Sequence, residues 1–297
     1  MGRTTAMGSM TGRVCLVTGG NRGIGKATAM ELARRGATVT LTSRDRVRGE
    51  RAAAGIRERT GNPAVRAVEV DFSSPDSIRL MAGRIRAAFD RLHVLLLNHA
   101  LVSPELRRTP DGVEMTFAVN HLGVFAATLR LLDLLERSAP ARIVVVSSDA
   151  HSRGRLDLDD LGAERGYHPR RAYQASKLAN LLFTYELARR IAGSGVTANC
   201  LHPGIIRTRL FDTVVSTWFS PVPALVRAFR FVFAGPARGA RTSVYLASSP
   251  EVEGVSGKYF RRFRPARSSA RSRDPEMARR LWEVSRALTG LDRDLPG

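Results

Sequence analysis

Short apolar runs alternate along this chain with longer segments whose composition suits helices. The runs are rich in Val, Leu and Ile, as buried strands are. They lie at residues 14–17, 39–42, 65–70, 94–97, 143–146 and 196–201. Helices are expected at about 24–35, 45–59, 112–137 and 171–191, in a segment that opens at Ser74, and near Arg238, with a seventh strand at 258–260 and a last helix at 275–288.

This alternation predicts a fold of the α/β class. Continuous apolar strands separated by helices indicate a parallel sheet covered on both faces, with right-handed crossovers. We therefore expect a Rossmann-type doubly wound sheet of about seven strands. No linker divides the chain, so residues 12–297 are interpreted as one domain and residues 1–11 as a flexible N-terminal segment.

Composition narrows the cellular setting. Of the 297 residues 43% are hydrophobic, which suffices for a sizeable core. The polar N-terminus lacks the apolar run of a secretory signal, and no transmembrane helix is expected. Cys15 and Cys200 lie inside apolar runs and are expected to be buried thiols, outside any disulfide or metal site. The chain is therefore predicted to be cytoplasmic and to hold no metal.

The formal net charge of +20 comes almost wholly from arginine, since lysine occupies only positions 26, 177 and 258. We interpret this usage as a property of composition rather than a binding surface. One basic stretch lies at 260–267 and continues to Arg271 and Arg273. A solvated basic face is our interpretation, anionic lipid is an alternative, and nucleic-acid binding is not expected.

Candidate site residues gather at one edge of the expected sheet. Ligands of such sheets bind beyond the carboxyl ends of the strands. Gly19, Asp71, Asn98, Ser148 and Pro203 all lie at or just past those ends. Their convergence predicts one site.

A glycine-rich turn follows the first strand, as Thr18-Gly19-Gly20-Asn21-Arg22-Gly23-Ile24-Gly25. A strand, a glycine turn and a helix N-terminus expose amide donors at a positive dipole end, which suits a dinucleotide pyrophosphate. Its spacing differs from the common Gly-x-Gly-x-x-Gly fingerprint, and an ordinary loop is the alternative.

Cofactor preference is expected to follow from the end of the second strand. Ser43-Arg44 stands where NAD-preferring proteins usually offer a carboxylate to the ribose hydroxyls. Arginine there suits a 2′-phosphate, with Arg22 assisting, so NADP is expected. The alternative is one more surface arginine. Asp71 is expected to receive the adenine amino group, or to cap a turn.

Tyr173 and Lys177 stand four residues apart, on one face of the helix expected at 171–191. A free phenol has a pKa of about 10, so proton transfer near pH 7 needs a nearby cation. Lys177 can supply that charge. The pair therefore predicts a proton donor for hydride chemistry.

These motifs, in their order and spacing, resemble the short-chain dehydrogenase/reductase family. The match is carried by the glycine turn, Asn98-His99-Ala100, Asn120, Ser147-Ser148, Tyr173-x-x-x-Lys177 and Pro203-Gly204. Further motifs are similar to its retinol-dehydrogenase-like branch, which includes WW-domain oxidoreductase and protochlorophyllide reductase relatives. They are Ser43-Arg44-Asp45, Val119-Asn120-His121-Leu122-Gly123, Ala150-His151, Ser176-Lys177-Leu178-Ala179-Asn180, Leu201-His202-Pro203-Gly204 and Gly257-Lys258-Tyr259-Phe260.

The resemblance implies roles for individual residues. Tyr173 exchanges the proton with the substrate oxygen, which Ser148 also binds, and Ser147 is structural. Lys177 holds the nicotinamide ribose, and Asn120 completes a water-linked relay with it. The cofactor-binding residues implied are Thr18, Gly19, Asn21, Arg22, Gly23, Ile24, Gly25, Ser43, Arg44, Asp71, Phe72, Asn98, His99, Ala100, Tyr173, Lys177, Pro203, Gly204 and Thr208.

Two further segments affect the expected cofactor affinity and the expected substrate. The family usually shows Asn-Asn-Ala-Gly after the fourth strand, whereas His99 and Ala100 stand here, and weakened cofactor affinity is the consequence to test. His99 itself is expected to be structural. The apolar segment at about 208–235 is expected to form a substrate lid, so the substrate should be hydrophobic. Its alternative is peripheral contact with a membrane.

The sequence thus predicts an NADP(H)-dependent oxidoreductase that moves hydride between nicotinamide and a hydrophobic carbonyl or alcohol. The alternative is an NADP-binding sensor or interaction protein with the same fold and little turnover. Homo-oligomers are usual in the family, although the lid and tail could block such packing.

Overall fold

One sheet contains every strand that the structure describes. The structure is a computed structural model, and it describes residues 7–206, 213 and 234–291. The strands are β1 (Val14–Val17), β2 (Thr38–Ser43), β3 (Val65–Glu69), β4 (Val94–Leu97), β5 (Ala141–Val146), β6 (Val196–His202), β7 (Tyr259–Arg261) and β8 (Arg264–Pro265). Their order is β3-β2-β1-β4-β5-β6-β7-β8, and all neighbours are parallel except β7 and β8.

The predicted doubly wound fold is confirmed, with one strand more than the sequence indicated. β8 pairs antiparallel with β7 inside the basic stretch. Arg262 and Phe263 make the reversal at positive φ values of 46° and 70°. A two-residue strand carries no apolar periodicity, so its pattern could not be recognised.

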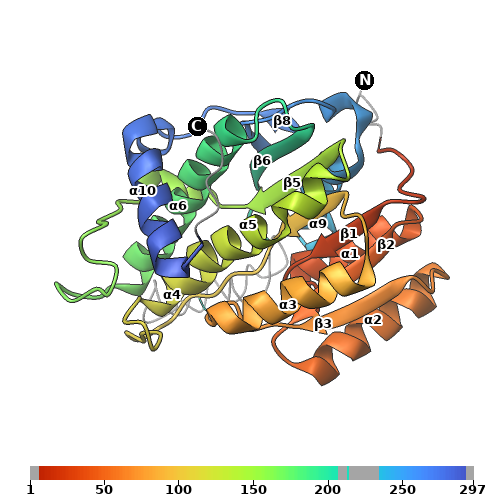
Figure 1. Cartoon of the computed structure of the whole chain (residues 1–297), viewed down its shortest axis with the longest axis horizontal. Coiled ribbons are helices and arrows are strands. Elements are labelled where there is room, and N and C mark those ends of the chain that lie inside the picture. The colour runs from red at the N-terminus through yellow and green to blue at the C-terminus, as the bar shows by residue number, and fades with distance from the viewer. Residues whose placement is uncertain (1–6, 207–212, 214–233, 292–297) are drawn as a thin grey trace.

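Helices cover both faces of the sheet (Figure 1). Helices α1, α2 and α9 pack on one face, and α3, α5 and α6 pack on the other, with α10 lying against α6. The long helices are α1 (Gly23–Arg34), α2 (Arg46–Thr60), α3 (Pro75–Ala88), α5 (Gly123–Glu136), α6 (Pro169–Arg190), α9 (Pro236–Ser248) and α10 (Pro275–Thr289). Short helical turns occur at α4 (Met115–Phe117), Asp149–Arg153, Pro250–Val252 and Arg271–Arg273.

Local chemistry explains where helices begin and end. The Ser74 hydroxyl accepts a hydrogen bond from the Ser77 amide and so caps α3, as Asp274 caps α10. Gly61 ends α2 in the left-handed conformation at φ 67°. Residues 7–11, part of the segment expected to be flexible, are hydrogen-bonded to the rest of the protein through Gly8 and Met10.

The helix expected at 112–137 is interrupted. Between α4 and α5 lies a π-helical turn at Ala118–Leu122, in which the Gly123 amide donates to the Ala118 carbonyl five residues back. The added residue widens the helix at Asn120, whose side chain is fully buried. The surrounding apolar residues hide this interruption from a sequence pattern, and π-turns of this kind often mark functional sites.

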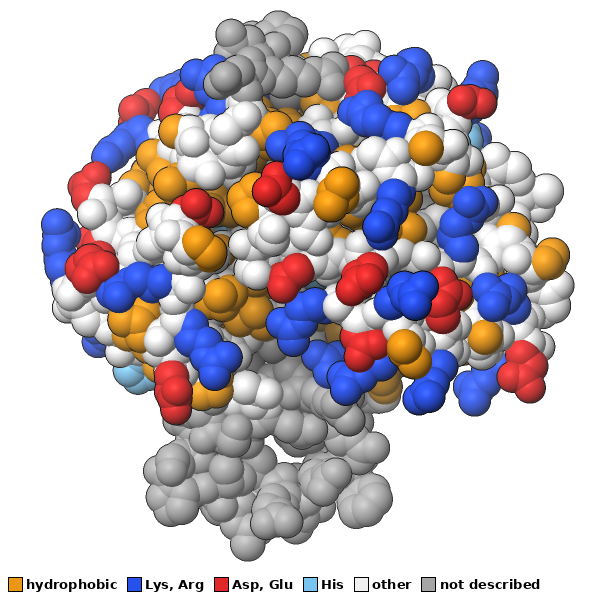
Figure 2. Space-filling view, turned by 60° about the horizontal axis from the view of Figure 1, so that its bottom comes forward, with side chains coloured by type: hydrophobic (Ala, Val, Ile, Leu, Met, Phe, Trp, Pro, Cys, Tyr) orange, Lys and Arg blue, Asp and Glu red, His pale blue; other side chains and the backbone are white. Residues whose placement is uncertain are grey.

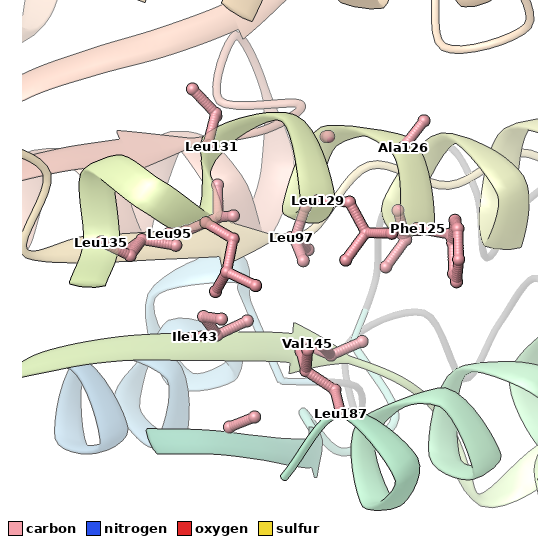
Figure 3. Close-up of a cluster of buried hydrophobic side chains, with 14 of the residues drawn as sticks. Leu95, Leu97, Phe125, Ala126, Leu129, Leu131, Leu135, Ile143, Val145 and Leu187 are labelled. Atoms are coloured by element: carbon pink, nitrogen blue, oxygen red, sulfur yellow. The ribbon is translucent and has the colours of Figure 1, made fainter. Parts of the chain in front are cut away.

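The core lies between the sheet and its helices. Figure 3 shows Leu95 of β4, Phe125 of α5, Ile143 of β5 and Leu187 of α6 among its packed side chains. In the described part of the chain, one helical stretch, Met115–Glu136, has the length and apolar character of a membrane span. Because 89% of its apolar window is buried inside the protein, it is the central core helix of this fold.

Charged side chains are mixed on the face shown in Figure 2. Lys and Arg are interspersed there with Asp and Glu, and they do not gather into one patch. Several ion pairs of the described chain lie within one helix, such as Arg79–Asp76 and Arg279–Glu276. Exposed pairs of this kind contribute at most about 1 kcal/mol each, so packing dominates the stability.

We predict that Trp282→Ala destabilises the protein by about 3–5 kcal/mol, because it leaves a cavity where the indole packs between α10 and the core. The indole lies 5.0 Å from the Phe125 ring and 5.9 Å from the Phe183 ring, centroid to centroid, and is 2% exposed. Urea unfolding measures the change. Leu288→Ala, at a 37% exposed position of the same helix, is the control and should shift stability by about 0.5 kcal/mol or less. Equal effects of the two variants would contradict this account of α10.

Candidate active site

A cavity of about 1010 Å³ opens at the carboxyl ends of the parallel strands. Residues that follow β1, β2, β3, β4 and β6 line it, together with two side chains of α6. This is the edge where ligands of doubly wound sheets bind. The lining includes these residues expected from sequence: Gly19, Asn21, Arg22, Gly23, Ile24, Ser43, Arg44, Asp71, Phe72, Asn98, His99, Ala100, Tyr173, Lys177 and Pro203.

The glycine turn packs so closely that side chains are excluded. Gly19 has φ 62°, and a Cβ there would lie 3.0 Å from the His99 Cα. A Cβ on Gly25 would lie 2.4 Å from the Gly19 carbonyl oxygen and 2.5 Å from Nδ2 of the Asn98 side chain. No side chain caps the N-terminus of α1, whose residues Gly23 and Ile24 face the cavity. The turn therefore offers a dinucleotide pyrophosphate a close backbone and a positive helix end.

Hydrogen bonds fix this turn to the neighbouring strands. The Gly19 amide donates to the Thr42 hydroxyl at 3.0 Å. The Thr18 hydroxyl accepts from the Asn98 amide at 2.8 Å, and the Asn98 side chain donates to the Thr18 carbonyl at 3.1 Å. Thr18 is fully buried and Gly25 is also buried, so both support the cavity from behind.

Cations surround the end of the cavity beside β2. Arg22 and Arg44 were expected there from the sequence. Sequence reasoning missed Lys26, Arg48 and Arg51, which also line this end. The spacing of Arg44, Arg48 and Arg51 by four and three residues is a helical signal that could have revealed them.

Two carboxylates at this end are already engaged. Asp45 caps α2 through the Arg48 amide at 2.9 Å and pairs with the Arg48 side chain at 3.2 Å. Asp71 lines the cavity while its Oδ1 accepts from the amide and the hydroxyl of Ser73, at 2.9 and 2.7 Å. Oδ1 of Asp71 thus makes the turn-capping contact, and contact of this side chain with an adenine amino group stays a prediction. The net balance near Arg44 remains positive.

Tyr173 and Lys177 project from α6 at the other end of the cavity. Both are buried, and the Tyr173 phenol is hydrogen-bonded to Ser148. The Lys177 ammonium lies 5.5 Å from the centre of the Tyr173 ring and donates to the Val146 carbonyl at 3.2 Å. The Ser147 hydroxyl donates to the Lys177 main-chain carbonyl at 3.0 Å, which is a structural contact.

Burial controls the ionisation of this pair. It raises the pKa of Tyr173 to about 12, and the hydrogen bond from Ser148 only partly opposes the shift. It lowers the pKa of Lys177 to about 8. Acidification of the phenol by Lys177, expected from the sequence, stays a prediction, and burial acts on the Tyr173 pKa in the opposite direction. At pH 7 the pair is a neutral phenol beside a mostly protonated ammonium.

The side chain of Asn120 holds the loop after β4. Its Oδ1 accepts from the Leu101 amide at 2.8 Å, and its Nδ2 donates to the Leu101 carbonyl at 2.9 Å and to the Ser176 hydroxyl at 3.1 Å. These contacts use both Nδ2 hydrogens, while Oδ1 keeps a second lone pair, and the water-linked relay to Lys177 stays a prediction.

The remaining expected residues are placed differently. Ser148 does not line the cavity but reaches it through Tyr173, and Gly204 is exposed beside Pro203. Thr208 and most of the lid predicted at about 208–235 lie outside the described residues. Sequence reasoning also missed the apolar lining, because a single hydrophobic residue at the end of a strand, in a helical turn or in a loop does not show that it faces a cavity: Leu101, Val119, Val146 and Pro236.

Comparison with known proteins agrees with this geometry. Residues 13–217 match the model of the short chain dehydrogenase family. Human retinol dehydrogenase 14 is 44% identical over 96% of this chain and 88% of its own length, and human retinol dehydrogenase 13 is 43% identical over 98% and 88%.

Solved structures share the fold. A crystal structure of an uncharacterized protein from Mycobacterium paratuberculosis superposes with a TM-score of 0.78 at 35% identity, covering 98% of this chain and 97% of its own. The NADP complex of Pseudomonas aeruginosa RhlG has a TM-score of 0.67 at 27% identity, covering 85% and 95%.

We predict that Gly25→Ala weakens binding of a nicotinamide dinucleotide by about tenfold or more, equivalent to about 1.4 kcal/mol. Its methyl group would collide with the Gly19 carbonyl, so the turn must open. Calorimetric titration measures the affinity. Gly83→Ala on α3 is the control, since nothing lies within 4 Å of its added Cβ. Unchanged affinity in a folded Gly25→Ala protein would show that the turn does not hold the cofactor.

Proposed function

The chain belongs to the short-chain dehydrogenase family, and from this premise we propose that it is an NADP(H)-dependent oxidoreductase for a hydrophobic carbonyl or alcohol. One observation carries the proposal. The buried Tyr173 and Lys177 lie at one end of a cavity whose other end has the glycine turn and a group of arginines. A dinucleotide spans two such ends, with its phosphates at the turn and its reactive ring at the acid–base pair.

The proposed mechanism assigns a task to each group. When bound, the nicotinamide would supply or accept the hydride. The turn at Gly19 and the N-terminus of α1 bind phosphate. Tyr173 transfers the proton to the substrate oxygen, Ser148 hydrogen-bonds to the same oxygen, and Lys177 stabilises negative charge that develops there.

The protonation of the site suits the proton-donating step of carbonyl reduction near neutral pH. Reduction needs a phenol that carries its proton, and a Tyr173 pKa of about 12 keeps it protonated. It also benefits from a charged Lys177, which a pKa of about 8 leaves mostly protonated at pH 7. Alcohol oxidation needs the phenolate, which burial disfavours.

Preference for NADP is supported by the cations near β2. A 2′-phosphate attracts arginine through charge-assisted, often bidentate hydrogen bonds. Arg44 and Arg51 line this end, and no ion pair to a carboxylate is found for either among the described residues. Two structural relatives are complexes with NADP or NADPH, from Pseudomonas aeruginosa and Escherichia coli CFT073.

A hydrophobic substrate is supported by the names of the relatives and by the lining. The human relatives are called retinol dehydrogenases, and retinol is an apolar alcohol. Leu101, Val119 and Pro236 give the cavity apolar walls. A cytoplasmic location, with peripheral membrane contact as the alternative, stays a prediction.

We predict that Tyr173→Phe lowers turnover of an aromatic or isoprenoid aldehyde with NADPH by about 10²- to 10⁴-fold, because the proton donor is lost. Cofactor affinity should change little, since only one hydroxyl is removed. Loss of nicotinamide absorbance measures turnover, and fluorescence titration measures affinity. Tyr185→Phe, on the same helix but hydrogen-bonded to Ser268, is the control and should retain activity.

Two outcomes of that experiment would reject the proposal in different ways. Full activity of Tyr173→Phe would remove the proposed acid. Tight NADP binding by the wild-type protein without turnover of any carbonyl in a broad panel would instead favour a cofactor-binding sensor or interaction protein.

We predict that Arg44→Ala raises the KM for NADPH by roughly 10- to 100-fold, since a hydrogen bond to a charged group contributes about 1.5–3 kcal/mol. The KM for NADH, which lacks the 2′-phosphate, should stay nearly constant. Steady-state kinetics with both cofactors provide the measurement. The control is Arg59→Ala, an exposed position on α2 away from the cavity. Equal changes for both cofactors would contradict a phosphate contact at Arg44.

A further inference from the structure

His99 is a buried side chain that the proposed reaction does not use. Its ring stacks on Phe72 with centroids 3.5 Å apart and planes 6° apart, and it is 8% exposed. Its Nδ1 lies 2.8 Å from the Thr18 hydroxyl and its Nε2 lies 3.0 Å from the Val119 carbonyl oxygen. The His99 ring therefore contacts three segments, which are the start of the glycine turn at Thr18, the loop after β3 and the π-turn.

The partners of His99 determine its tautomer. A carbonyl can only accept, so Nε2 carries the hydrogen and donates it to Val119. Nδ1 then accepts from the Thr18 hydroxyl, for which the Leu96 carbonyl, at 3.3 Å, is the more distant partner. Burial lowers the pKa of His99 to about 3, in agreement with a neutral ring. Both ring nitrogens are thus engaged.

The π-turn makes the Val119 carbonyl accessible to this ring. In a regular helix the Gly123 amide would donate to Val119, but here it donates to Ala118. The His99 imidazole also has room at this position because residue 123 is a glycine. A Cβ at Gly123 would lie 3.3 Å from Nε2 and 2.8 Å from the Phe72 carbonyl oxygen.

The next residue after Val119 is Asn120, whose side chain holds Leu101 by two hydrogen bonds. The loop after β4 and the π-turn are therefore joined twice, by His99 to Val119 and by Asn120 to Leu101. Val119 and Leu101 both line the cavity next to Lys177 and Tyr173. Displacing the turn would move Asn120 and the cavity wall together.

We propose that His99 is a positioning residue that holds the π-turn and Asn120 in register with the glycine turn, so that the proton-transfer end of the cavity is preorganised. The proposal rests on the proposed function, because its kinetic consequence is a slower chemical step. In the family pattern Asn-Asn-Ala-Gly, which stands where this chain has Leu97-Asn98-His99-Ala100, alanine occupies the place of His99, so the device belongs to this chain's own sequence.

The test separates the two kinds of contact that His99 makes. His99→Phe keeps an aromatic ring against Phe72 but removes both hydrogen bonds. It should lower kcat by about 10- to 100-fold through misplacement of the turn, while NADPH affinity changes only a few-fold. His99→Ala should lose both kcat and affinity. Imidazole added to His99→Ala should restore part of kcat, and it should not raise kcat of the wild type or of His99→Phe.

His93 provides a matched control, since it precedes the same strand that His99 follows and bonds to the Val14 amide at the opposite end of the sheet. His93→Ala should retain kcat and should not respond to imidazole. Wild-type kcat in His99→Phe would overturn the proposal, as would equal stimulation of all variants by imidazole.

Amide hydrogen exchange tests the positioning without turnover. The Leu101 amide donates to Asn120, so it should exchange faster in His99→Phe than in the wild type or in His93→Ala. Unchanged exchange at Leu101 would overturn the proposal even if no substrate were found. If the wild type showed no turnover but the Leu101 amide exchanged faster in His99→Phe, only the proposed function would be rejected.

Discussion

The site depends on how the carboxyl ends of β1 and β4 are joined. The buried Thr18 hydroxyl accepts from the Asn98 and His99 amides and also contacts the His99 ring. A buried hydroxyl with these partners fixes the glycine turn against the loop after β4, and an unpaired one would cost about 1–3 kcal/mol. Because α6 packs on the same sheet, this junction also sets the span between the glycine turn and Tyr173.

The cavity joins two electrostatic environments. Near Arg44 it is exposed to solvent and positively charged, which suits a charged and hydrated ligand group. Near Tyr173 and Lys177 it is buried, and desolvation raises the pKa of the phenol and lowers the pKa of the ammonium. The transition state of a bond-changing step is better stabilised at the buried end, because fixed dipoles there act with little screening by solvent. Binding energy collected at the positive end can therefore place reacting atoms at the apolar end.

Sequence patterns identified strands β1 to β7, most of the helices between them and most of the cavity lining, because apolar runs and glycine spacing are local signals. The π-turn at Asn120 was not visible, since one extra residue in a buried helix leaves its apolar character unchanged. Lys26 was missed because its sequence context does not show that it faces the cavity, whereas the helical spacing of Arg51 from Arg44 and Arg48 could have revealed it. The contacts of His99 and of Asn120 join residues about 20 positions apart, so only the folded chain reveals them.

In the proposed reaction, hydride passes directly between a bound nicotinamide and a carbonyl at Tyr173. The decisive experiment is the reduction of an apolar aldehyde with NADPH deuterated at one face of C4. We predict that one of the two labelled forms transfers deuterium to the product carbon and shows a slower rate, while the other yields unlabelled product. Product without label from both forms, or no oxidation of NADPH by any carbonyl, would contradict the claim.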